Sequence, residues 1–445
     1  TLGGAGQIDP ADGDTYIGAP GAVLDGGGSN QYAFVGQYND LNDENVTIEY
    51  LTIQHFDPSQ GAGAVNGNGN NGWTEEYNLI QDNSPGAGVM LGGDNAVNDN
   101  CMTNNGEYGA QGYSYVDQTY EASSFTGGAL NITFDGNEVS FNNTQHTNSG
   151  IEGGVKFWQN GNVNVVGNYV HDNYGSPGLW MDTDNAGFLV QGNYISNNGG
   201  PGIMYEISYN ALVQDNTFVG NGIESGPSAG EFPTGAIYVS ESGGDSRVPS
   251  NYAGELMIAN NDFSDNWGGV VIYQNPNRYC GDGQDPCPLI PPAGVSIGLW
   301  IGDNGGTGNG PSLCPSNLSE TSPVDYHDLC HWPAQNVTVT ENTFSFNPSD
   351  AVFGGTCSQT VNCGQSAIFS DYSSTSAYPG YTICNAISNL QSNVFSDNTY
   401  IGPWTFYYFN QGDVATPAQW QAGATNVESS GYNFNPQDAG STFTS

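Results

Sequence analysis

Between Asn160 and Gly222 the chain repeats one short phrase three times. Each copy is an apolar run followed by Gly-Asn or Asp-Asn, then an aromatic residue or Thr, a β-branched or aromatic residue, and an Asn-rich turn. The asparagines of the phrase are Asn168, Asn193 and Asn216, which stand 25 and 23 residues apart. A repeat of this length, built from segments too short to fold alone, predicts stacked coils that bury their apolar sides against one another.

The residue types of the repeat select the kind of solenoid. Leucine-rich repeats need leucine at fixed offsets, and leucine is sparse here. Helical repeats need long stretches with a 3.6-residue period, whereas these segments are short and interrupted by Gly and Asn. The sequence therefore predicts a parallel β-helix with three short strands per coil, and its 12% aromatic content argues against the alternative, a disordered Asn-rich segment. The phrase asparagine is expected at a corner, in the left-handed region, with its amide bonded to neighbouring coils.

The charge balance excludes two classes of partner. The chain has three basic residues against 45 acidic ones, which gives a formal net charge of −42. Nucleic acid and anionic membrane surfaces both need Lys and Arg to neutralise phosphate, so neither is expected as a partner. No apolar run is long enough to span a membrane. Because most carboxylates lack a basic neighbour, Ca²⁺ is a plausible cofactor that would reduce their repulsion.

Cysteine usage indicates an extracellular protein. Of the eight cysteines, seven lie between Cys280 and Cys384, without the paired C-x-x-C spacing that zinc sites use. Disulfides in loop-rich regions are therefore predicted, while Cys101 falls in a repeat phrase and is expected to be a buried core thiol. With so few Lys and Arg residues, the chain also offers almost no sites to the proteases that cut at them. We expect a secreted or cell-surface protein.

Residues 1–445 are expected to form a single β-helix domain, because a solenoid grows by adding coils. Residues 274–334 depart from the repeat, are rich in Pro and contain four Cys, and so predict a disulfide-tied loop insertion. Residues 399–445 form an aromatic tail, with a short helix expected over residues 417–422, and are predicted to cap the C-terminal end. No helix is predicted ahead of the first coil: either a cap was removed, or the open end contacts another copy of the chain.

One part of the repeat has residue types suited to chemistry. Lys156 precedes Trp180 by 24 residues, and Asp182 and Glu206 follow equivalent positions of successive coils. A column of basic and acidic side chains about 4.8 Å apart is therefore predicted on one face. It would suit proton transfer or Ca²⁺ binding, or a purely structural role in which Lys156 balances the acids. The candidate catalytic residues are Lys156, Asp182, Asp184 and Glu206; the candidate metal ligands are Asp182, Asp184 and Glu206; the candidate substrate-binding residues are Trp158, Trp180, His171, Tyr205 and Tyr209.

The stretches GGVKFW, GNYVHDN, SPGLWMDTDN and GNYISNNGGPGIMYEISYNALVQDNTFVGNG resemble secreted right-handed parallel β-helix repeat proteins of the pectate-lyase-like superfamily. The segments GDTYIGAPGAVLDG, TYIGPWTF and AQWQA are similar to that group as well. The resemblance implies a right-handed β-helix, in a group that includes lyases, hydrolases and epimerases acting on polysaccharides but also adhesins and fibres. Uronate lyases of this fold use Lys or Arg as base and charge clamp, often with Ca²⁺. Only Lys156 matches the base role and no second basic residue lies near it in sequence, which argues against polyuronate cleavage.

Two functional hypotheses follow. The favoured one is a structural or adhesive extracellular protein that assembles with itself, end to end, into fibres. The alternative is a polysaccharide-active enzyme, a lyase, hydrolase or epimerase, that uses the column of Lys, Asp and Glu side chains. The chain lacks the basic groove that acidic polysaccharides require, whereas neutral glycans need none.

Overall fold

The computed structural model covers most of the chain. The described residues are 7–36, 43–67, 72–113, 130–147, 153–246, 248, 250–275, 333–360, 362–370, 382–408, 414–427 and 432–444. They belong to two compact units, the first made of residues 1–116, 128–204 and 215–225 and the second of residues 117–127, 205–214 and 226–445. In each unit short parallel strands stack coil upon coil into three sheets, which confirms the predicted all-β, parallel β-helix fold.

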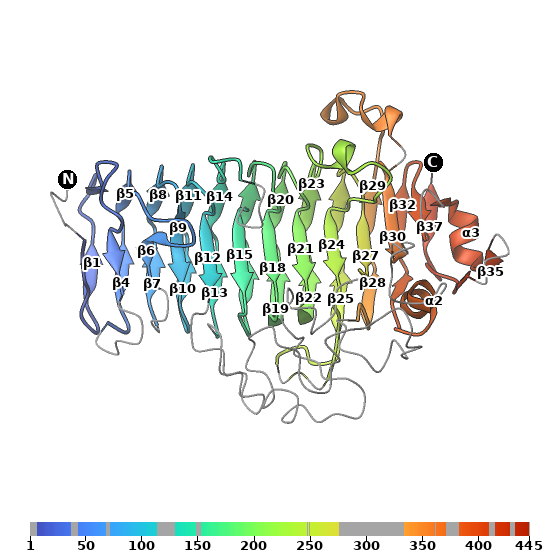
Figure 1. Cartoon of the computed structure of the whole chain (residues 1–445), viewed down its shortest axis with the longest axis horizontal. Coiled ribbons are helices and arrows are strands. Elements are labelled where there is room, and N and C mark those ends of the chain that lie inside the picture. Colours follow the sequence, from blue (N-terminus) through green and yellow to red (C-terminus); the bar gives the residue numbers. More distant parts are fainter. Residues whose placement is uncertain are drawn as a thin grey trace, which may run out of the picture. The chain divides into compact units, whose positions relative to one another are not determined.

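The first unit contains three parallel sheets (Figure 1). Its first sheet has the order β1 (Thr15–Ile17), β4 (Thr47–Glu49), β7 (Thr74–Glu76), β10 (Ala96–Asn98), β13 (Thr133–Asp135), β16 (Asn164–Val166) and β19 (Ala186–Gln191). Its second sheet has the order β2 (Val23–Asp25), β5 (Thr52–Gln54), β8 (Leu79–Gln81), β11 (Cys101–Thr103), β14 (Glu138–Ser140), β17 (Tyr169–His171), β20 (Tyr194–Ser196) and β23 (Thr217–Val219). Its third sheet has the order β3 (Phe34–Val35), β6 (Gly63–Asn66), β9 (Ala87–Leu91), β12 (Ala110–Tyr113), β15 (Val155–Trp158) and β18 (Leu179–Asp182).

The second unit repeats this construction. One sheet joins β22 (Tyr209–Gln214), β25 (Leu256–Ala259), β28 (Val337–Thr340) and β31 (Val394–Ser396); another joins β26 (Asp262–Ser264), β29 (Thr343–Ser345), β32 (Thr399–Ile401) and β37 (Thr442–Thr444). The third joins β24 (Ile237–Ser240), β27 (Val270–Tyr273), β30 (Gln365–Phe369) and β33 (Thr405–Tyr407), with β34 (Val414–Ala415) added antiparallel. Strand β21 (Ile203–Glu206) has two residues in each unit.

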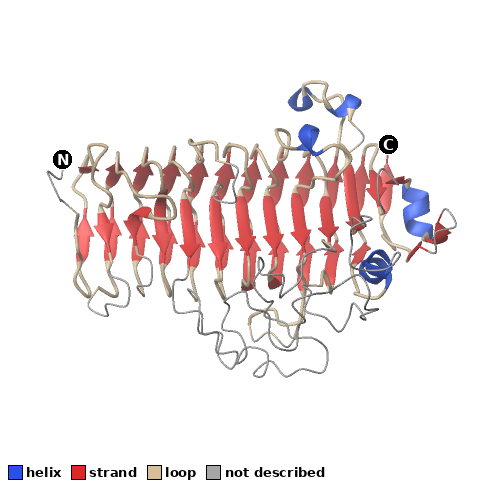
Figure 2. Cartoon of the chain, viewed as in Figure 1, coloured by secondary structure: helices blue, strands red, loops and turns tan. Residues whose placement is uncertain are grey.

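The helices in the described part of the second unit are short (Figure 2). They are η1 (Gly226–Ala229), η3 (Ala351–Phe353), η4 (Cys357–Gln359), α2 (Thr382–Asn389) and α3 (Pro417–Ala422), and a two-stranded hairpin joins β35 (Ala424–Val427) to β36 (Tyr432–Phe434). Helix α3 has the predicted bounds and begins with a capping box between Thr416 and Gln419. Its Trp420 stacks on Phe406, with ring centroids 4.9 Å apart. Among the described residues, no helix has the length and apolar character needed to cross a membrane.

The core is built from strands whose middle residue faces inward. Successive side chains of a strand point to opposite faces, so a three-residue strand buries one side chain. In the first sheet of the first unit, Val97, Phe134, Val165 and Val190 are consecutive Cα partners and all are fully buried. At one inward position of this sheet the buried side chain is not apolar. Glu75 occupies this position, between its Cα partners Ile48 and Val97.

Asparagines form two ladders at the corners of the first unit. In each rung the side-chain amide donates to the side-chain oxygen of the next asparagine and to a backbone carbonyl. The first ladder consists of Asn78, Asn100, Asn137, Asn168, Asn193 and Asn216, and the second of Asn83, Asn105, Asn142, Asn173, Asn198 and Asn221.

The ladders confirm that the asparagines of the repeated phrase bond from coil to coil, but they correct the expected backbone. The left-handed residue is the one before the asparagine, as at Gly167 (φ 65°), Gly192 (φ 65°) and Asp215 (φ 56°). That residue turns the chain at the corner, and the asparagine after it directs its amide along the stack.

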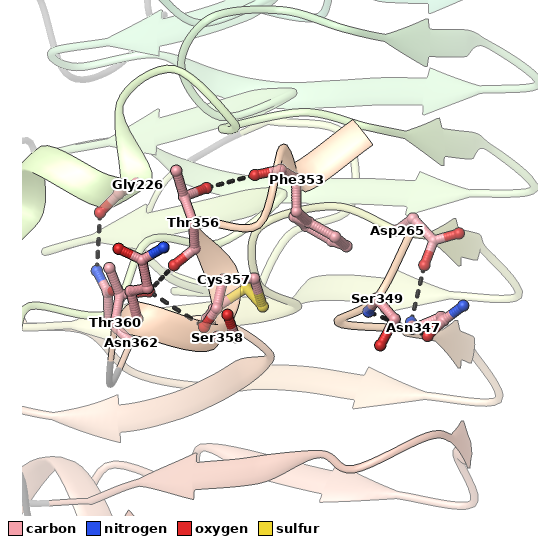
Figure 3. The surroundings of a disulfide bond; sticks show 12 residues. Gly226, Asp265, Asn347, Ser349, Phe353, Thr356, Cys357, Ser358, Thr360 and Asn362 are labelled. Carbon is pink, nitrogen blue, oxygen red and sulfur yellow. Dashed lines mark hydrogen bonds between the residues drawn. A yellow bond between two sulfur atoms is a disulfide. The ribbon is translucent and has the colours of Figure 1, made fainter. Parts of the chain in front are cut away.

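The only disulfide among the described residues joins Cys357 to Cys363, beside η3 and η4 (Figure 3). In this loop the Thr356 hydroxyl donates to the carbonyl of Phe353, and the Asn362 amide donates to the carbonyl of Gly226. The pair confirms a disulfide in a loop-rich segment. Of the predicted insertion, residues 276–332 lie outside the described residues.

Cys101 corrects a further expectation. It is a free thiol on the outer face of β11 and is partly exposed, whereas the next residue, Met102, fills the core position of that strand. The repeated phrase correctly predicted a strand here. The residue whose side chain faces inward, however, is the second one after the ladder asparagine.

Candidate functional site

The candidate site lies on the outer face of the third sheet in the first unit. Strand β15 buries Val155 and Phe157 completely, so Lys156 and Trp158 belong to its outer face. In the register with β18, Lys156 is the Cα partner of Trp180 and Trp158 is the partner of Asp182. Lys156 and Trp180 are therefore neighbours in one outer column, as their spacing in the sequence predicts, and Asp182 lies in the adjacent column.

The ammonium of Lys156 contacts both an acid and an aromatic ring. Its Nζ is 2.8 Å from Oδ2 of Asp182 and 3.8 Å from the ring centroid of Trp180. The Lys156 side chain is 9% exposed and the Asp182 side chain 17%, so the pair is shielded from bulk water and weakly screened by salt. The other carboxylate oxygen, Oδ1, accepts a hydrogen bond from the hydroxyl of Thr183 at 2.9 Å. The arrangement holds the acid in one orientation with a neutralising charge beside it.

Asp184 lies in the corner that follows β18. Its backbone is left-handed (φ 54°) and its side chain is buried. The next residue, Asn185, accepts a hydrogen bond from the backbone N–H of Asn160 and donates one to the carbonyl of Phe157. Asp184 therefore belongs to a structural corner, whereas Asp182 belongs to the strand face.

Glu206, Tyr205 and Tyr209 belong to the second unit. Glu206 ends β21 and is largely buried. Tyr205 points into the core, donates its hydroxyl to the carbonyl of Tyr209 at 3.1 Å, and has its pKa raised by burial. Tyr209 is buried as well. Both tyrosines were candidate substrate-binding residues. Side chains alternate along β21, and the alternation places the ring of Tyr205 in the interior. Because both rings are buried, neither offers a surface to a substrate.

His171 is also displaced from the predicted cluster. It ends β17, which belongs to the second sheet of the first unit, whereas Lys156, Trp180 and Asp182 lie on the third sheet. One coil passes through all three sheets, so residues close in sequence reach different faces. The imidazole instead lies among Glu138, Tyr169 and Asp172.

Asp182, one of the predicted calcium ligands, is already engaged by other groups. Within the described ranges, no three His, Cys, Asp or Glu side chains are grouped in a way that would hold a metal ion. Asp182 already contacts the Lys156 ammonium through one oxygen and a hydroxyl through the other, and a cation would have to displace the ammonium. The donor set around Asp182 therefore does not fit Ca²⁺, which needs six to eight oxygen ligands.

Sequence reasoning missed the aromatic residues that follow the ladder asparagines. Tyr169 and Tyr194 are Cα partners on β17 and β20, and both rings are exposed. The signal was present in the repeated phrase, where an aromatic residue or Thr follows each asparagine. The residue directly after a ladder asparagine points outward, and the residue after that points into the core. This alternation would have identified Tyr169 and Tyr194 as surface residues.

Comparison with known proteins supports the fold. Residues 63–253 match the family model described as the right handed beta helix region. A search of curated proteins finds no match. Solved structures similar to this chain include the A-module of the Azotobacter vinelandii mannuronan C-5 epimerase AlgE4, at 13% identity and a TM-score of 0.40, covering 78% of this chain and 83% of that one.

Two further similar structures are XylC in complex with xylose and the enzymatically active domain of tailspike protein 2 from bacteriophage CBA120. The first has 12% identity and a TM-score of 0.41, covering 86% of this chain and 54% of that one. The second has 11% identity and a TM-score of 0.30, covering 60% of this chain and 40% of that one. At these identities and TM-scores, none of the three structures indicates what this chain does.

Proposed function

Since the chain is a right-handed parallel β-helix protein, we propose that it is a secreted or cell-surface adhesive protein that binds neutral polysaccharide on its outer strands. The observation that carries this proposal is the engagement of Lys156, the only Lys or Arg among the described residues. Its ammonium is occupied by Asp182 and Trp180, so it is not presented to a charged ligand. The outer strands are therefore suited to ligands without negative charge.

Electrostatics decides between glycan classes. A polyuronate carries a carboxylate on each sugar, and it would approach a chain with a formal net charge of −42. Like charges oppose such an encounter and slow association. Neutral polysaccharides do not meet this barrier, and their ring C–H faces and hydroxyls match a surface of aromatic rings and carboxylates.

The test is affinity electrophoresis of the purified chain in gels that contain a defined polysaccharide. Hydroxyethylcellulose, xyloglucan and galactomannan are the neutral probes, and polygalacturonate and alginate are the acidic ones. We expect retardation in at least one neutral gel and none in the acidic gels. Retardation confined to the acidic gels would show that the proposed ligand class is wrong.

A second candidate is polysaccharide cleavage or epimerisation at Asp182. The observation that favours it is a carboxylate on an outer strand face, oriented by Thr183 and neutralised by Lys156, with Trp158 at the partner position. Asp182 would transfer the proton and Lys156 would position it. Reducing-end and uronate-configuration assays on all five polysaccharides test this candidate, with Asp182→Asn and Lys156→Met as variants. Turnover that Asp182→Asn abolishes would make the protein an enzyme; absence of turnover would leave binding as its activity.

Self-association is the other part of the adhesive proposal. An uncovered first coil of a solenoid has strand edges with backbone groups that pair readily with another chain. If copies add end to end, negative-stain electron microscopy of the concentrated protein will show filaments one β-helix wide. Dispersed particles at all concentrations would remove fibre formation from the proposal and leave glycan binding to be judged by the gels.

A further inference from the structure

A second face of the first unit carries a different set of groups. In the second sheet, β14, β17 and β20 each have two outward positions that flank a buried middle residue. Consecutive Cα partners give one outer column of Cys101, Glu138, Tyr169, Tyr194 and Thr217 and another of Thr103, Ser140, His171, Ser196 and Val219. Aromatic, acidic and imidazole side chains therefore meet over β14, β17 and β20.

His171 is held by carboxylates on both sides of its ring. Its Nδ1 is 2.7 Å from Oδ2 of Asp172, and its Nε2 is 3.3 Å from Oε1 of Glu138. Asp172 has a left-handed backbone (φ 52°), which turns the chain after β17 and brings the carboxylate back to the ring of the preceding residue. The imidazole is buried, while the two acids are partly exposed, at 49% for the Glu138 side chain and 36% for the Asp172 side chain.

Aromatic rings surround the imidazole. Tyr169 stacks on His171, with ring centroids 3.7 Å apart and an interplanar angle of 19°. Tyr194 meets Tyr169 at 68° with centroids 5.4 Å apart, so the two rings form a corner rather than a flat strip. On the other side, Phe141 lies edge-on to the imidazole at 5.8 Å, and Tyr174 lies next to Phe141. We define Glu138, Tyr169, His171, Asp172 and Tyr194 as the histidine patch.

The exposed rings of the histidine patch leave apolar surface in water. Tyr169 is 41% exposed and Tyr194 44% exposed, although His171, which stacks on Tyr169, is buried. Clustered aromatic surface of this kind marks an interaction site, because covering it releases about 25 cal/mol per Å² of apolar area. The stacked imidazole and its two carboxylates hold Tyr169 in place, which lowers the entropy that a ligand must remove on binding.

The geometry points to the histidine patch as a second glycan-binding site, one that takes a single neutral pyranose residue of a polysaccharide. The C–H face of the sugar packs in the corner between Tyr169 and Tyr194, and its hydroxyls donate to the carboxylates of Glu138 and Asp172. No Lys or Arg of the described residues lies on this sheet, and the acids would repel a uronate. An apolar peptide is disfavoured because it would remove water from both carboxylates without supplying hydrogen-bond donors in its place.

This inference rests on the proposed function and adds the place and the sugar class. It is tested by isothermal titration of the intact chain with cellohexaose or mannohexaose, chosen by the backbone of the polysaccharide that retards the protein. Tyr169→Ala and Tyr194→Ala should each weaken binding at least tenfold, and Tyr169→Phe should retain it because the ring remains. The matched controls are Tyr50→Ala and Tyr77→Ala, which remove an exposed stacked pair elsewhere in the same unit; less than a twofold change is expected.

A local readout separates this site from other glycan contacts. The imidazole signals of His171, assigned with His171→Gln, should shift in nitrogen–proton NMR spectra when the hexaose is added. If the chain binds a neutral hexaose but Tyr169→Ala and Tyr194→Ala bind as tightly and the His171 signals stay fixed, the histidine patch is not a site although the proposed function stands. If neither gels nor titration detect any neutral glycan, the proposed function and this inference both fail.

Discussion

A single residue, Glu75, makes the core of the first unit sensitive to pH. It occupies an inward position between Ile48 and Val97, and both of its carboxylate oxygens are buried without a hydrogen-bond partner from another described residue. Burial raises the pKa of this carboxyl to about 8, because an ionised oxygen would lose its hydration, and this loss outweighs the hydrogen bond from the residue's own backbone N–H. The side chain is therefore protonated in the folded protein at neutral pH.

Glu75 sets the direction of a pH effect on stability. In the unfolded chain the carboxyl ionises near 4.5, whereas in the folded chain it keeps its proton up to about pH 8. The contribution of Glu75 to the free energy of unfolding is therefore complete below about pH 4.5. It falls as the pH rises toward about 8, by on the order of a few kcal/mol.

Replacing Glu75 by Gln should remove this dependence. We expect Glu75→Gln to match the wild type at about pH 4.5 and to melt at a higher temperature at about pH 8, because the amide has no proton to lose. Thermal unfolding followed by circular dichroism across this range measures the effect. Asp57→Asn, which removes an exposed carboxylate of the same unit, is the control for net charge. Parallel melting curves for Glu75→Gln and wild type would contradict the assignment.

At the scale of the element, the corner ladders stabilise the coils by satisfying buried polar groups. Asn137 donates to the carbonyl of Val97 and to the side chain of Asn168, and it accepts from the backbone and side chain of Asn100. An isolated buried amide would destabilise the fold, but every rung supplies the partners that its neighbours lack. The ladder therefore transmits register from one coil to the next.

Removing one rung should be measurably destabilising. In Asn137→Ala the backbone N–H of Asn100 loses its acceptor inside the corner, so we expect a loss of about 1–3 kcal/mol in the free energy of unfolding. Urea unfolding monitored by tryptophan fluorescence gives this value. Asn164→Ala is the matched control, because Asn164 is exposed on neighbouring β16 and should cost less than about 0.5 kcal/mol. Equal losses for the two variants would show that the ladder contributes nothing special.

At the scale of the whole molecule, repulsion between carboxylates should limit stability. With 45 acidic residues and three basic ones, salt is expected to raise the melting temperature by screening. Melting curves in sodium chloride and choline chloride at equal ionic strength should coincide. Calcium and magnesium chloride at matched ionic strength then test the predicted cofactor: a stabilisation by millimolar Ca²⁺ alone would indicate a specific site, whereas equal effects would indicate general screening.

Much of this architecture could be predicted from the sequence because it depends on local repetition. The spacing of Asn168, Asn193 and Asn216 predicted the stacked coils, and the offset between Lys156 and Trp180 predicted their shared column. Helix α3 was predicted because the short stretch PAQWQA favours a helix by its local sequence alone.

The part of the site that could not be predicted depends on which face of its strand each side chain occupies and on which sheet that strand joins. Tyr205 was expected at the surface, but its side chain lies in the core. Packing of β21 against the neighbouring coils, rather than the residue type, decides which of its side chains point inward. His171 was expected beside Lys156, but the lengths of the turns between strands place it on another sheet. Glu75 could not be recognised as a core residue, because a carboxylate on a strand is ordinarily an outward one.

The rungs of the first ladder are separated along the chain by 22, 37, 31, 25 and 23 residues, although their contacts are the same. The hydrogen bonds at the corner therefore form regardless of how many residues separate one ladder asparagine from the next. A deletion of residues 168–192 would join Asn137 to Asn193 through the bonds that now link it to Asn168. A gene for such a protein can lengthen or shorten by whole coils through unequal recombination, and each product keeps an intact corner from the moment it arises.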